Sequence, residues 1–165
     1  MADSALFTGY REHIRFGALS LDGLGVVYWG ACSMVLKDNM IAHRTSVFEA
    51  NSALFMDTHG IGMANADELP SGYRATWGDR ARLCVAKLAA EIKDDIESDE
   101  FARELLVQGR TTADDDFIEV HVWGPINIRT VDRVVIQRRK RAPSKVSIRA
   151  LRVKLKKLGV PLEEQ

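Results

Sequence analysis

The sequence predicts an α+β fold in which a mixed or antiparallel sheet is flanked by helices. Residues 25–37, 117–128 and 132–138 are rich in β-branched and aromatic side chains, which is typical of strands. Segments with helical spacing of apolar residues lie between and after these strands, without the regular alternation of a doubly wound sheet. The length of 165 residues fits one domain, so residues 1–165 are predicted to form a single domain.

Four helices are predicted from local patterns. The longest has one apolar face, made of Trp77, Ala81, Cys84, Leu88 and Ile92. Ser46 followed by Glu49 matches a capping box, which predicts a helix that begins at Val47 and ends before Gly60. A shorter helix is expected over 98–108, and a short helix or irregular arm over 4–16.

The fourth helix begins at Pro143–Ser144 and ends at Gly159. One face of this helix is apolar, and the other carries Lys145, Arg149, Arg152 and Lys156. The basic run Arg138, Arg139, Lys140 and Arg141 precedes it. The segment 132–165 thus has a net charge of +8, and the remainder has −8. This asymmetry indicates a surface for nucleic acid or an acidic partner, or a basic tail that packs on the acidic body.

Several kinds of site are not expected. The sequence has no Walker A, GxSxG or GxGxxG motif, and its four histidines lack the spacing of metal ligands, so no metal is predicted. Cys32 and Cys84 are predicted to be buried thiols in a reducing compartment. No apolar segment approaches the roughly 20 residues of a membrane span, so a cytoplasmic protein without a membrane partner is expected. The oligomeric state is not readable from the sequence.

The strand around Glu119 has two contrasting faces. Side chains alternate along a strand, so Ile118, Val120 and Val122 point to one side. The opposite side carries a carboxylate and an imidazole among aromatic residues: Phe117, Glu119, His121 and Trp123. Aromatic neighbours exclude water, and catalytic groups tend to occupy such places. The alternative is a simple surface pair between a glutamate and a histidine.

Two blocks of the chain resemble a known family. IEVHVWGPI followed by TVDRVVI resembles the final block of the ADP-ribosyltransferase-like domains of polymorphic toxins and phage head-morphogenesis proteins. Upstream, YWGACSMVLKD followed by HRTSVFEANS is similar to the Tyr-Gly strand, Leu-Lys-Asp turn and Arg-Thr-Ser segment of the same family. The resemblance implies an ADP-ribosyltransferase-like fold, NAD as the substrate, and a protein or nucleic-acid target. It also fits a bacterial toxin or a phage or anti-phage effector, made in or delivered into a bacterial host.

The resemblance also implies roles for individual residues. Glu119 would stabilise the positive charge that develops as nicotinamide leaves, and Arg44 would bind the NAD pyrophosphate or ribose. Arg15 is an alternative for that arginine. Supporting residues are also implied: Thr45 or Ser46 behind Glu119, Tyr28 or Trp123 stacked on nicotinamide, and Asn51 with Ser52 around the same cleft.

The sequence departs from the family at one position. Many members carry Glu-x-Glu or Gln-x-Glu on the catalytic strand, whereas this chain has Glu119-Val120-His121. His121 is therefore included among the catalytic candidates. The alternative function is a non-enzymatic binding protein that uses its basic C-terminal face to hold nucleic acid or an acidic partner. The enzyme hypothesis requires Glu119 and Arg44 to lie close together in a cleft, and the binding hypothesis does not.

Overall fold

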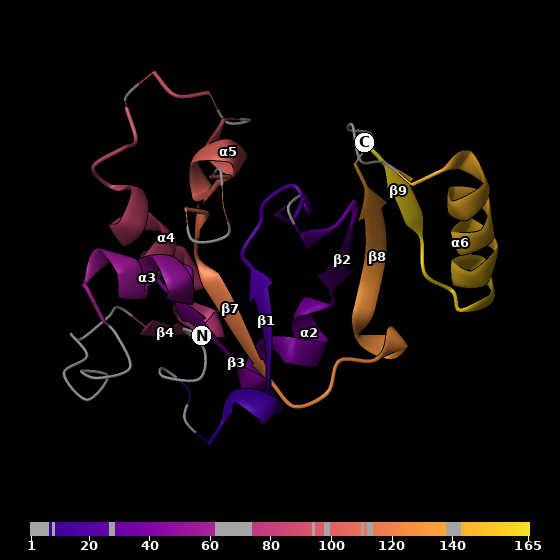
Figure 1. The fold of residues 1–165 in the computed structure, drawn as a ribbon, viewed down its shortest axis with the longest axis horizontal. Helices are drawn as coiled ribbons and strands as arrows, with labels where there is room; N and C mark the ends of the chain where they lie inside the picture. The colour runs from indigo at the N-terminus through magenta and orange to yellow at the C-terminus, as the bar shows by residue number, and fades with distance from the viewer. Residues whose placement is uncertain are drawn as a thin grey trace.

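The computed structural model describes residues 7, 9–26, 29–61, 74–93, 95–97, 100–109, 111, 114–137 and 143–165. Within these residues the chain forms two larger sheets and a two-stranded ladder, flanked by helices (Figure 1). The α+β class is confirmed, because strands that are mostly antiparallel make up the sheets and helices pack around them.

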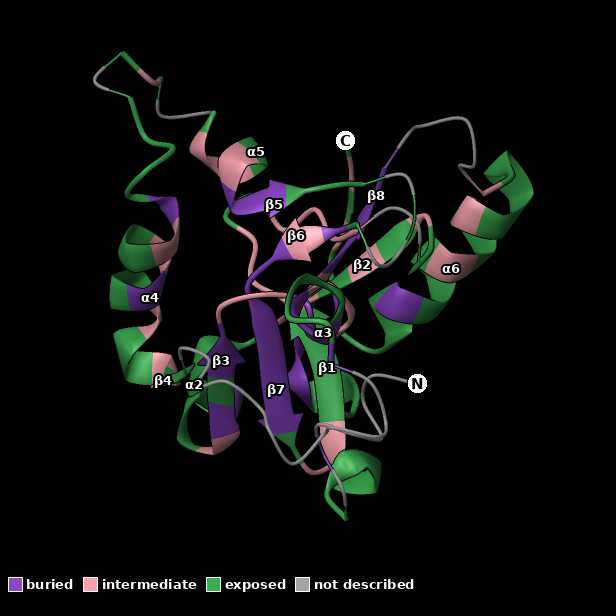
Figure 2. Cartoon of the chain, turned by 60° about the vertical axis from the view of Figure 1, so that its left-hand side comes forward, coloured by how far each residue is buried: buried purple, intermediate pink, exposed green. Residues whose placement is uncertain are grey.

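The first sheet, sheet A, has the strand order β1-β7-β3-β4 and is antiparallel throughout. Its strands are β1 (Ile14–Ala18), β7 (Glu119–Trp123), β3 (Thr45–Phe48) and β4 (Arg74–Thr76). The central strand β7 is almost entirely buried, whereas the edge strand β1 is largely exposed (Figure 2). In the register of the sheet, Glu119 lies between Ala18 of β1 and Phe48 of β3.

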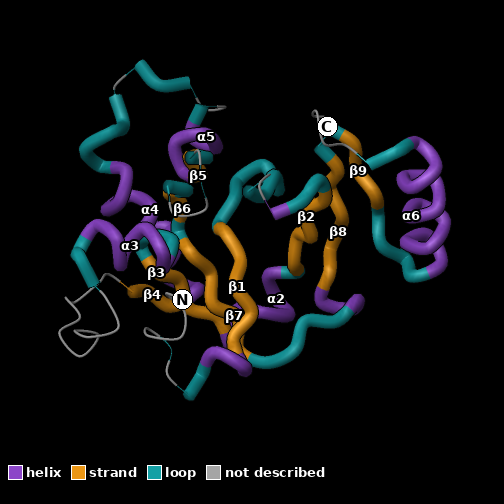
Figure 3. The backbone as a smooth tube through the Cα atoms, in the orientation of Figure 1, coloured by secondary structure: helices purple, strands orange, loops and turns teal. Residues whose placement is uncertain are grey.

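The second sheet, sheet B, has the order β2-β8-β9, with β8 antiparallel to β2 and parallel to β9. Its strands are β2 (Cys32–Leu36), β8 (Val131–Ile136) and β9 (Leu162–Glu164). The short ladder pairs β5 (Leu106–Val107) with β6 (Asp116–Phe117). Figure 3 shows the strands of the two sheets in neighbouring groups, with α6 beyond β9.

The helices are short except for the last. They are α2 (Asp38–Ile41), α3 (Ser52–Thr58), α4 (Arg80–Leu88), α5 (Phe101–Leu105) and α6 (Lys145–Lys157). Single 3₁₀ turns are η1 (Arg11–His13), η3 (Ala42–Arg44), η5 (Trp77–Asp79) and η6 (Ile128–Thr130). In the part of the chain that the structure describes, no helix has the length and apolar character needed to cross a bilayer.

Apolar side chains pack in three clusters. The main core lies on one face of sheet A and contains Ile41, Val47, Leu83, Leu88, Leu105, Ile118, Val120 and Val122. A smaller cluster joins Phe48 of β3 to Phe55 and Met56 of α3, and because Phe48 alternates with Val47, α3 covers the opposite face. The third cluster packs Leu155 of α6 on β8. Leu36 of β2 contacts both the first and the third cluster, so it connects the two sheets.

The predicted helix from Val47 is wrong at its start. Residues Thr45–Phe48 form strand β3, which pairs with β7 on one side and β4 on the other. The helix begins at Ser52, and the side chain of Asn51 caps it by accepting a hydrogen bond from the Ala53 N–H at 2.9 Å. The β-branched and aromatic residues of Thr-Ser-Val-Phe suit a strand between two partners, and this pairing outweighs the Ser46–Glu49 pattern.

Other boundaries differ more modestly from the prediction. Of the strand expected over 25–37, the described residues form only β2, and residues 27 and 28 lie outside them. The strand expected over 117–128 is interrupted at Ile118 and ends where Gly124 adopts a φ of 80°. The helix expected over 98–108 is α5, which gives way to β5 because Leu106 pairs with Phe117. Strand β1 was not predicted, and residues 4–6 and 8 of the expected arm lie outside the described residues.

The predictions for the helix of 77–92 and the last helix are largely confirmed. The first corresponds to α4, preceded by η5. The second is α6, where Ser144 is the N-cap and accepts a hydrogen bond from the Ser147 N–H at 3.1 Å. Gly159 follows with a φ of 70°, a conformation that glycine adopts without steric cost.

Shortening Ile118, which is 0% exposed in the main core, tests this packing. We expect Ile118→Ala to lower the free energy of unfolding by about 2–5 kcal/mol, because it leaves a cavity beside Val120 and Val122. The matched control Val146→Ala, at a side chain that is 79% exposed, should change it by less than about 0.5 kcal/mol. Urea denaturation measures both, and equal losses would contradict the core described above.

Candidate functional site

Glu119 and His121 lie on the face of sheet A that turns away from the main core. The exposed fractions of their side chains are only 7% and 6%, respectively. Their neighbours in the chain, Ile118, Val120 and Val122, all belong to the main core, as the alternation predicts. The site is therefore a buried carboxylate and imidazole on the central strand rather than a surface pair.

The carboxylate of Glu119 is held by three hydrogen bonds. The Ser52 N–H donates to Oε2 at 2.8 Å, and the Ser52 hydroxyl donates to Oε1 at 2.7 Å. The Nε2 atom of His121 lies 2.6 Å from the same Oε1. A carboxylate offers about four acceptor positions, so the donors among the described residues leave one open. These partners offset the cost of burying the carboxylate and fix its orientation.

The start of α3 explains why Ser52 reaches Glu119. The first N–H groups of a helix have no partner inside the helix, and here the Ser52 N–H donates to the Glu119 carboxylate. Asn51 anchors this helix end, because its Nδ2 donates to the Asp115 carbonyl oxygen at 2.9 Å. Helix α3 is thus held in place by Asp115, which directly precedes β6, and by Glu119 in β7.

Aromatic rings enclose the imidazole of His121. The ring centroids of Phe7 and Phe16 lie 4.8 and 5.3 Å from that of His121, both in edge arrangements. Phe48 lies on another side at 6.4 Å. The guanidinium of Arg74 lies 5.9 Å from the Phe7 ring and 5.5 Å from the Phe48 ring. These residues cover the Glu119–His121 pair and exclude water from it.

The support expected from Thr45 or Ser46 comes instead from Ser52. The hydroxyl of Thr45 donates to the Ile41 carbonyl oxygen at 2.7 Å, on the core side of the sheet. Ser46 lies opposite His121 in the register and is exposed, but among the described residues its side chain has no hydrogen bond to Glu119. Asn51 and Ser52 are the two residues of the upstream block that converge on this site.

Arg44 is not close to Glu119. Its guanidinium donates to the carbonyl oxygen of Trp123, at the far end of β7. Trp123 and Glu119 are the two ends of β7, about 13 Å apart along an extended strand. The expected cleft that contains both Arg44 and Glu119 is therefore absent from the described residues.

Arg15 does not fill this place either. Its Nη1 donates to the carbonyl oxygens of Glu12 and Ile14 at 2.9 and 3.1 Å, at the exposed edge of the sheet. Arg74, which the sequence did not single out, lies opposite Phe48 in the register. Phe48 lies opposite Glu119, so Arg74 is two strand spacings, about 10 Å, from Glu119 across the same face.

Trp123, one of the two aromatic residues predicted to stack on nicotinamide, is not at Glu119. Trp123 is 48% exposed and lies at the end of β7, with the His13 ring at 5.3 Å and the Tyr10 ring at 6.1 Å. Tyr28 lies outside the described residues. The aromatic residues nearest the pair are instead Phe7, Phe16 and Phe48.

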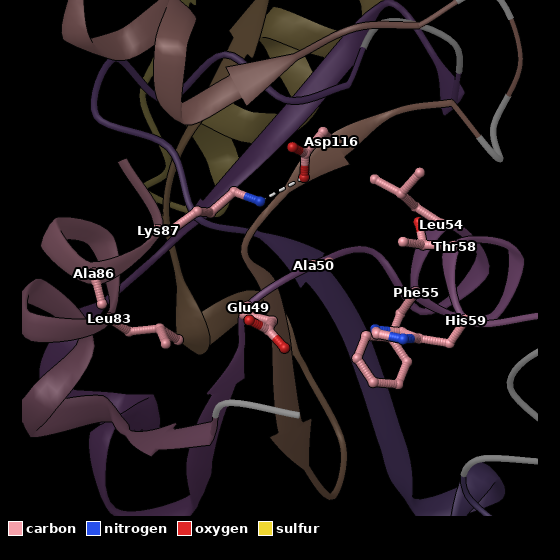
Figure 4. A pocket seen from close by; sticks show the side chains of 10 residues that line it. All are labelled: Glu49, Ala50, Leu54, Phe55, Thr58, His59, Leu83, Ala86, Lys87 and Asp116. Atoms are coloured by element: carbon pink, nitrogen blue, oxygen red, sulfur yellow. Dashed lines mark hydrogen bonds and ion pairs between the residues drawn. The ribbon is translucent and has the colours of Figure 1, made fainter. Parts of the chain in front are cut away.

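A groove of about 510 Å³ opens beside this site, between α3 and α4 (Figure 4). Lys87 and Asp116 form an ion pair at 2.5 Å along one side, and the Phe55 and His59 rings lie on the other. Glu49 and Ala50, which also line the groove, directly precede Asn51 and Ser52. Glu119 itself does not line it.

The cysteines and metal-ligand residues add little to the site. Burial raises the pKa of the Cys84 thiol, while a hydrogen bond to the Cys84 backbone and the Arg80 charge act in the opposite direction. Cys32 is exposed at the start of β2, which corrects the prediction that both thiols are buried. Among the described residues, no three or more His, Cys, Asp or Glu side chains are placed to hold a metal ion.

The basic residues lie in a different part of the molecule. Lys145, Arg149 and Lys156 are exposed on α6, and Arg152 forms an ion pair with Glu164. The basic run Arg138, Arg139, Lys140 and Arg141 lies outside the described residues. Helix α6 is on the far side of sheet B from α4 and α5 (Figure 1). The structure therefore separates the basic residues of α6 from the group around Glu119.

A scan against models of known protein families gives no match to this chain, and a search of curated proteins gives none either. The basis for a function is thus the arrangement of Ser52, Glu119 and His121 together with the resemblance of the segments that contain them.

Replacing each serine of the upstream block separates the roles of Ser46 and Ser52. We expect Ser52→Ala to lower the free energy of unfolding by about 1–3 kcal/mol, because one donor to a buried carboxylate is lost. Ser46→Ala removes an exposed hydroxyl and should change it by less than about 0.5 kcal/mol. Thermal or urea unfolding of both variants provides the comparison, and a larger effect at Ser46 would refute the assignment.

Proposed function

We propose that this protein transfers ADP-ribose from NAD to a protein or nucleic-acid target, with Glu119 as the catalytic carboxylate. One observation carries the proposal. The upstream block ends in Asn51-Ser52 and the downstream block contains Glu119, and Ser52 donates two hydrogen bonds to Glu119 although 67 positions separate them. Each block was singled out by its resemblance to ADP-ribosyltransferase-like domains, and their meeting at one carboxylate supports a shared role.

The chemistry needs a fixed anion next to the reacting sugar. When the bond between nicotinamide and ribose breaks, its electron pair leaves with nicotinamide and positive charge develops on the ribose. A carboxylate whose donors already hold it in place stabilises this charge without reorganising. The remaining acceptor position of Glu119 suits a ribose hydroxyl. The nucleophile of the target then attacks the sugar carbon and releases its proton, which gives the ADP-ribosylated target.

His121 is assigned a positioning role. Its Nε2 is directed at Glu119, so in the neutral ring the proton is assigned to Nε2 and Nδ1 is left without one. The ring and the Ser52 hydroxyl both bond to Oε1, so together they keep the carboxylate in place. This accounts for a histidine at the position where many members of the family carry a second acidic residue.

Access to Glu119 requires its cover to move. The carboxylate is 7% exposed, and Phe7 packs against His121. Displacement of Phe7 would also free Arg74, whose guanidinium lies over the same ring. Arg44 was expected to bind the pyrophosphate of NAD, but it lies at the far end of β7, and we assign that role to Arg74 instead. A guanidinium on this face suits the pyrophosphate, because its donors match two phosphate oxygens at once.

The first test is release of nicotinamide from NAD by the wild type and by Glu119→Gln. Glutamine keeps the shape and removes the charge, so we expect a loss of about 10²–10³-fold in rate. Glu91→Gln, at an exposed glutamate after α4, is the matched control and should leave the rate unchanged. Chromatography of nicotinamide measures all three, and full activity of Glu119→Gln would refute the proposal.

The role of Arg74 is tested with Arg74→Gln and Arg15→Gln. Loss of one charge-assisted hydrogen bond to the pyrophosphate should raise KM for NAD about tenfold in Arg74→Gln. In Arg15→Gln, KM should stay at the wild-type value, because within the described chain that guanidinium bonds to the backbone carbonyls of its neighbours Glu12 and Ile14. Steady-state kinetics with varied NAD gives both values. If Arg15→Gln has the larger effect, the arginine is wrongly assigned.

A further inference from the structure

Helix α6 is a strongly basic surface. Its thirteen residues include six cations and no acidic side chain: Lys145, Arg149, Arg152, Lys154, Lys156 and Lys157. All six are exposed, and most of the helix is exposed as well (Figure 2). Among the described residues, only Arg152 of these six is in an ion pair, with Glu164. The alternative in which the basic tail packs on the acidic body therefore does not account for the other five.

The cations surround the outward side of α6 rather than a single edge. Leu155 and Leu151 pack toward β8 on the inner side. Val146 and Val153, seven residues apart and so on one line of the helix, are 79% and 52% exposed on the outer side. At 100° per residue, Arg149 and Lys156 lie on one flank of this line, Lys154 lies on the other, and Lys157 lies close to the line itself at the C-terminal end. The exposed face is thus two small apolar side chains with cations on both flanks and at the C-terminal end.

We infer that α6 binds double-stranded DNA through its phosphate backbone, with the outer face of the helix directed into the major groove. A helix of thirteen residues is about 20 Å long and 10–12 Å wide, and the major groove of B-form DNA is about 12 Å wide. Cations on the two flanks then face the two phosphate strands that border the groove. Val146 and Val153 at the centre face the edges of the bases, where the thymine methyl is the group that an apolar side chain can contact. This inference does not depend on the use of NAD.

Other anionic partners fit this helix less well. Single-stranded nucleic acid is bound by stacking on aromatic rings, and α6 has none. The major groove of RNA duplexes is too narrow for a helix. Helices that lie in a membrane surface present Trp, Phe or Leu to the lipid, whereas the outward line here consists of valines. An acidic protein would gain little from a face without an aromatic anchor.

The placement of α6 allows a duplex to approach it. The helix projects beyond β9 at one end of the molecule, opposite α4 and α5 (Figure 1). The acidic residues outnumber the basic ones by eight before residue 132 and are outnumbered by eight after it. A polyanion is therefore attracted to the α6 side and repelled from the other, which orients the encounter.

The experiment measures fluorescence anisotropy of a labelled 20-base-pair DNA duplex of mixed sequence with the full chain, without NAD. With about five phosphate contacts, the affinity should fall roughly 500-fold between 50 and 200 mM salt. The variant Lys145→Gln/Arg149→Gln/Lys156→Gln should weaken binding at least about tenfold at 50 mM salt and flatten the salt dependence. Glutamine retains most of the helix propensity, and circular dichroism verifies that α6 still forms.

The matched control is Arg82→Gln/Lys93→Gln/Arg103→Gln, which removes the same charge from exposed sites on and after α4 and on α5. It should keep the affinity within about threefold, because distant charges are screened. The inference is overturned by absence of DNA binding at 50 mM salt or by an equal loss in this control. Tighter binding to an RNA duplex, to single-stranded DNA or to phosphatidylserine vesicles would also overturn it. Glu119→Gln should bind DNA as the wild type does, so this test and the nicotinamide test fail independently.

Discussion

The burial of one carboxylate constrains much of sheet A. Glu119 sits on the central strand with 7% of its side chain exposed, and a buried charge needs donors close to it. Ser52 and His121 supply these donors, which requires the first turn of α3 to lie on the sheet. That placement brings Phe55 onto Phe48 and creates the second apolar cluster. The groove beside α3 then follows from where this helix is held.

The sequence was sufficient where a pattern is local. The alternation around Glu119 and the apolar and basic faces of α6 both follow from period-two and helical spacing. It failed at residues 45–48, where pairing with β4 and β7 decides the structure and a short capping pattern is overridden. The sequence also did not reveal that Arg74 lies on the same face of sheet A as Glu119, because that position follows from the register of β3 and β4. Contacts that depend on register are not visible from spacing alone.

The buried Glu119 site and the basic surface of α6 are built on different sheets. The Ser52–Glu119–His121 group belongs to sheet A and to the helix that covers its face, whereas α6 packs on β8 of sheet B. Among the described residues, Leu36 is the apolar side chain that contacts the cores of both. Because the two sites lie on different sheets, a change at one of them is expected to leave the local structure of the other intact.

The pairing of the strands has a consequence for how this chain is made. Ile14 of β1 pairs with Trp123 of β7, and Cys32 of β2 pairs with Ile136 of β8, in each case about a hundred residues later in the chain. A topology dominated by such distant contacts has a high contact order and folds slowly. On the ribosome, neither sheet can close until β7 and β8 have emerged. Until then β2 lacks its partner β8 and β3 can pair only with β4, and during that interval the nascent chain is most exposed to aggregation and to chaperones.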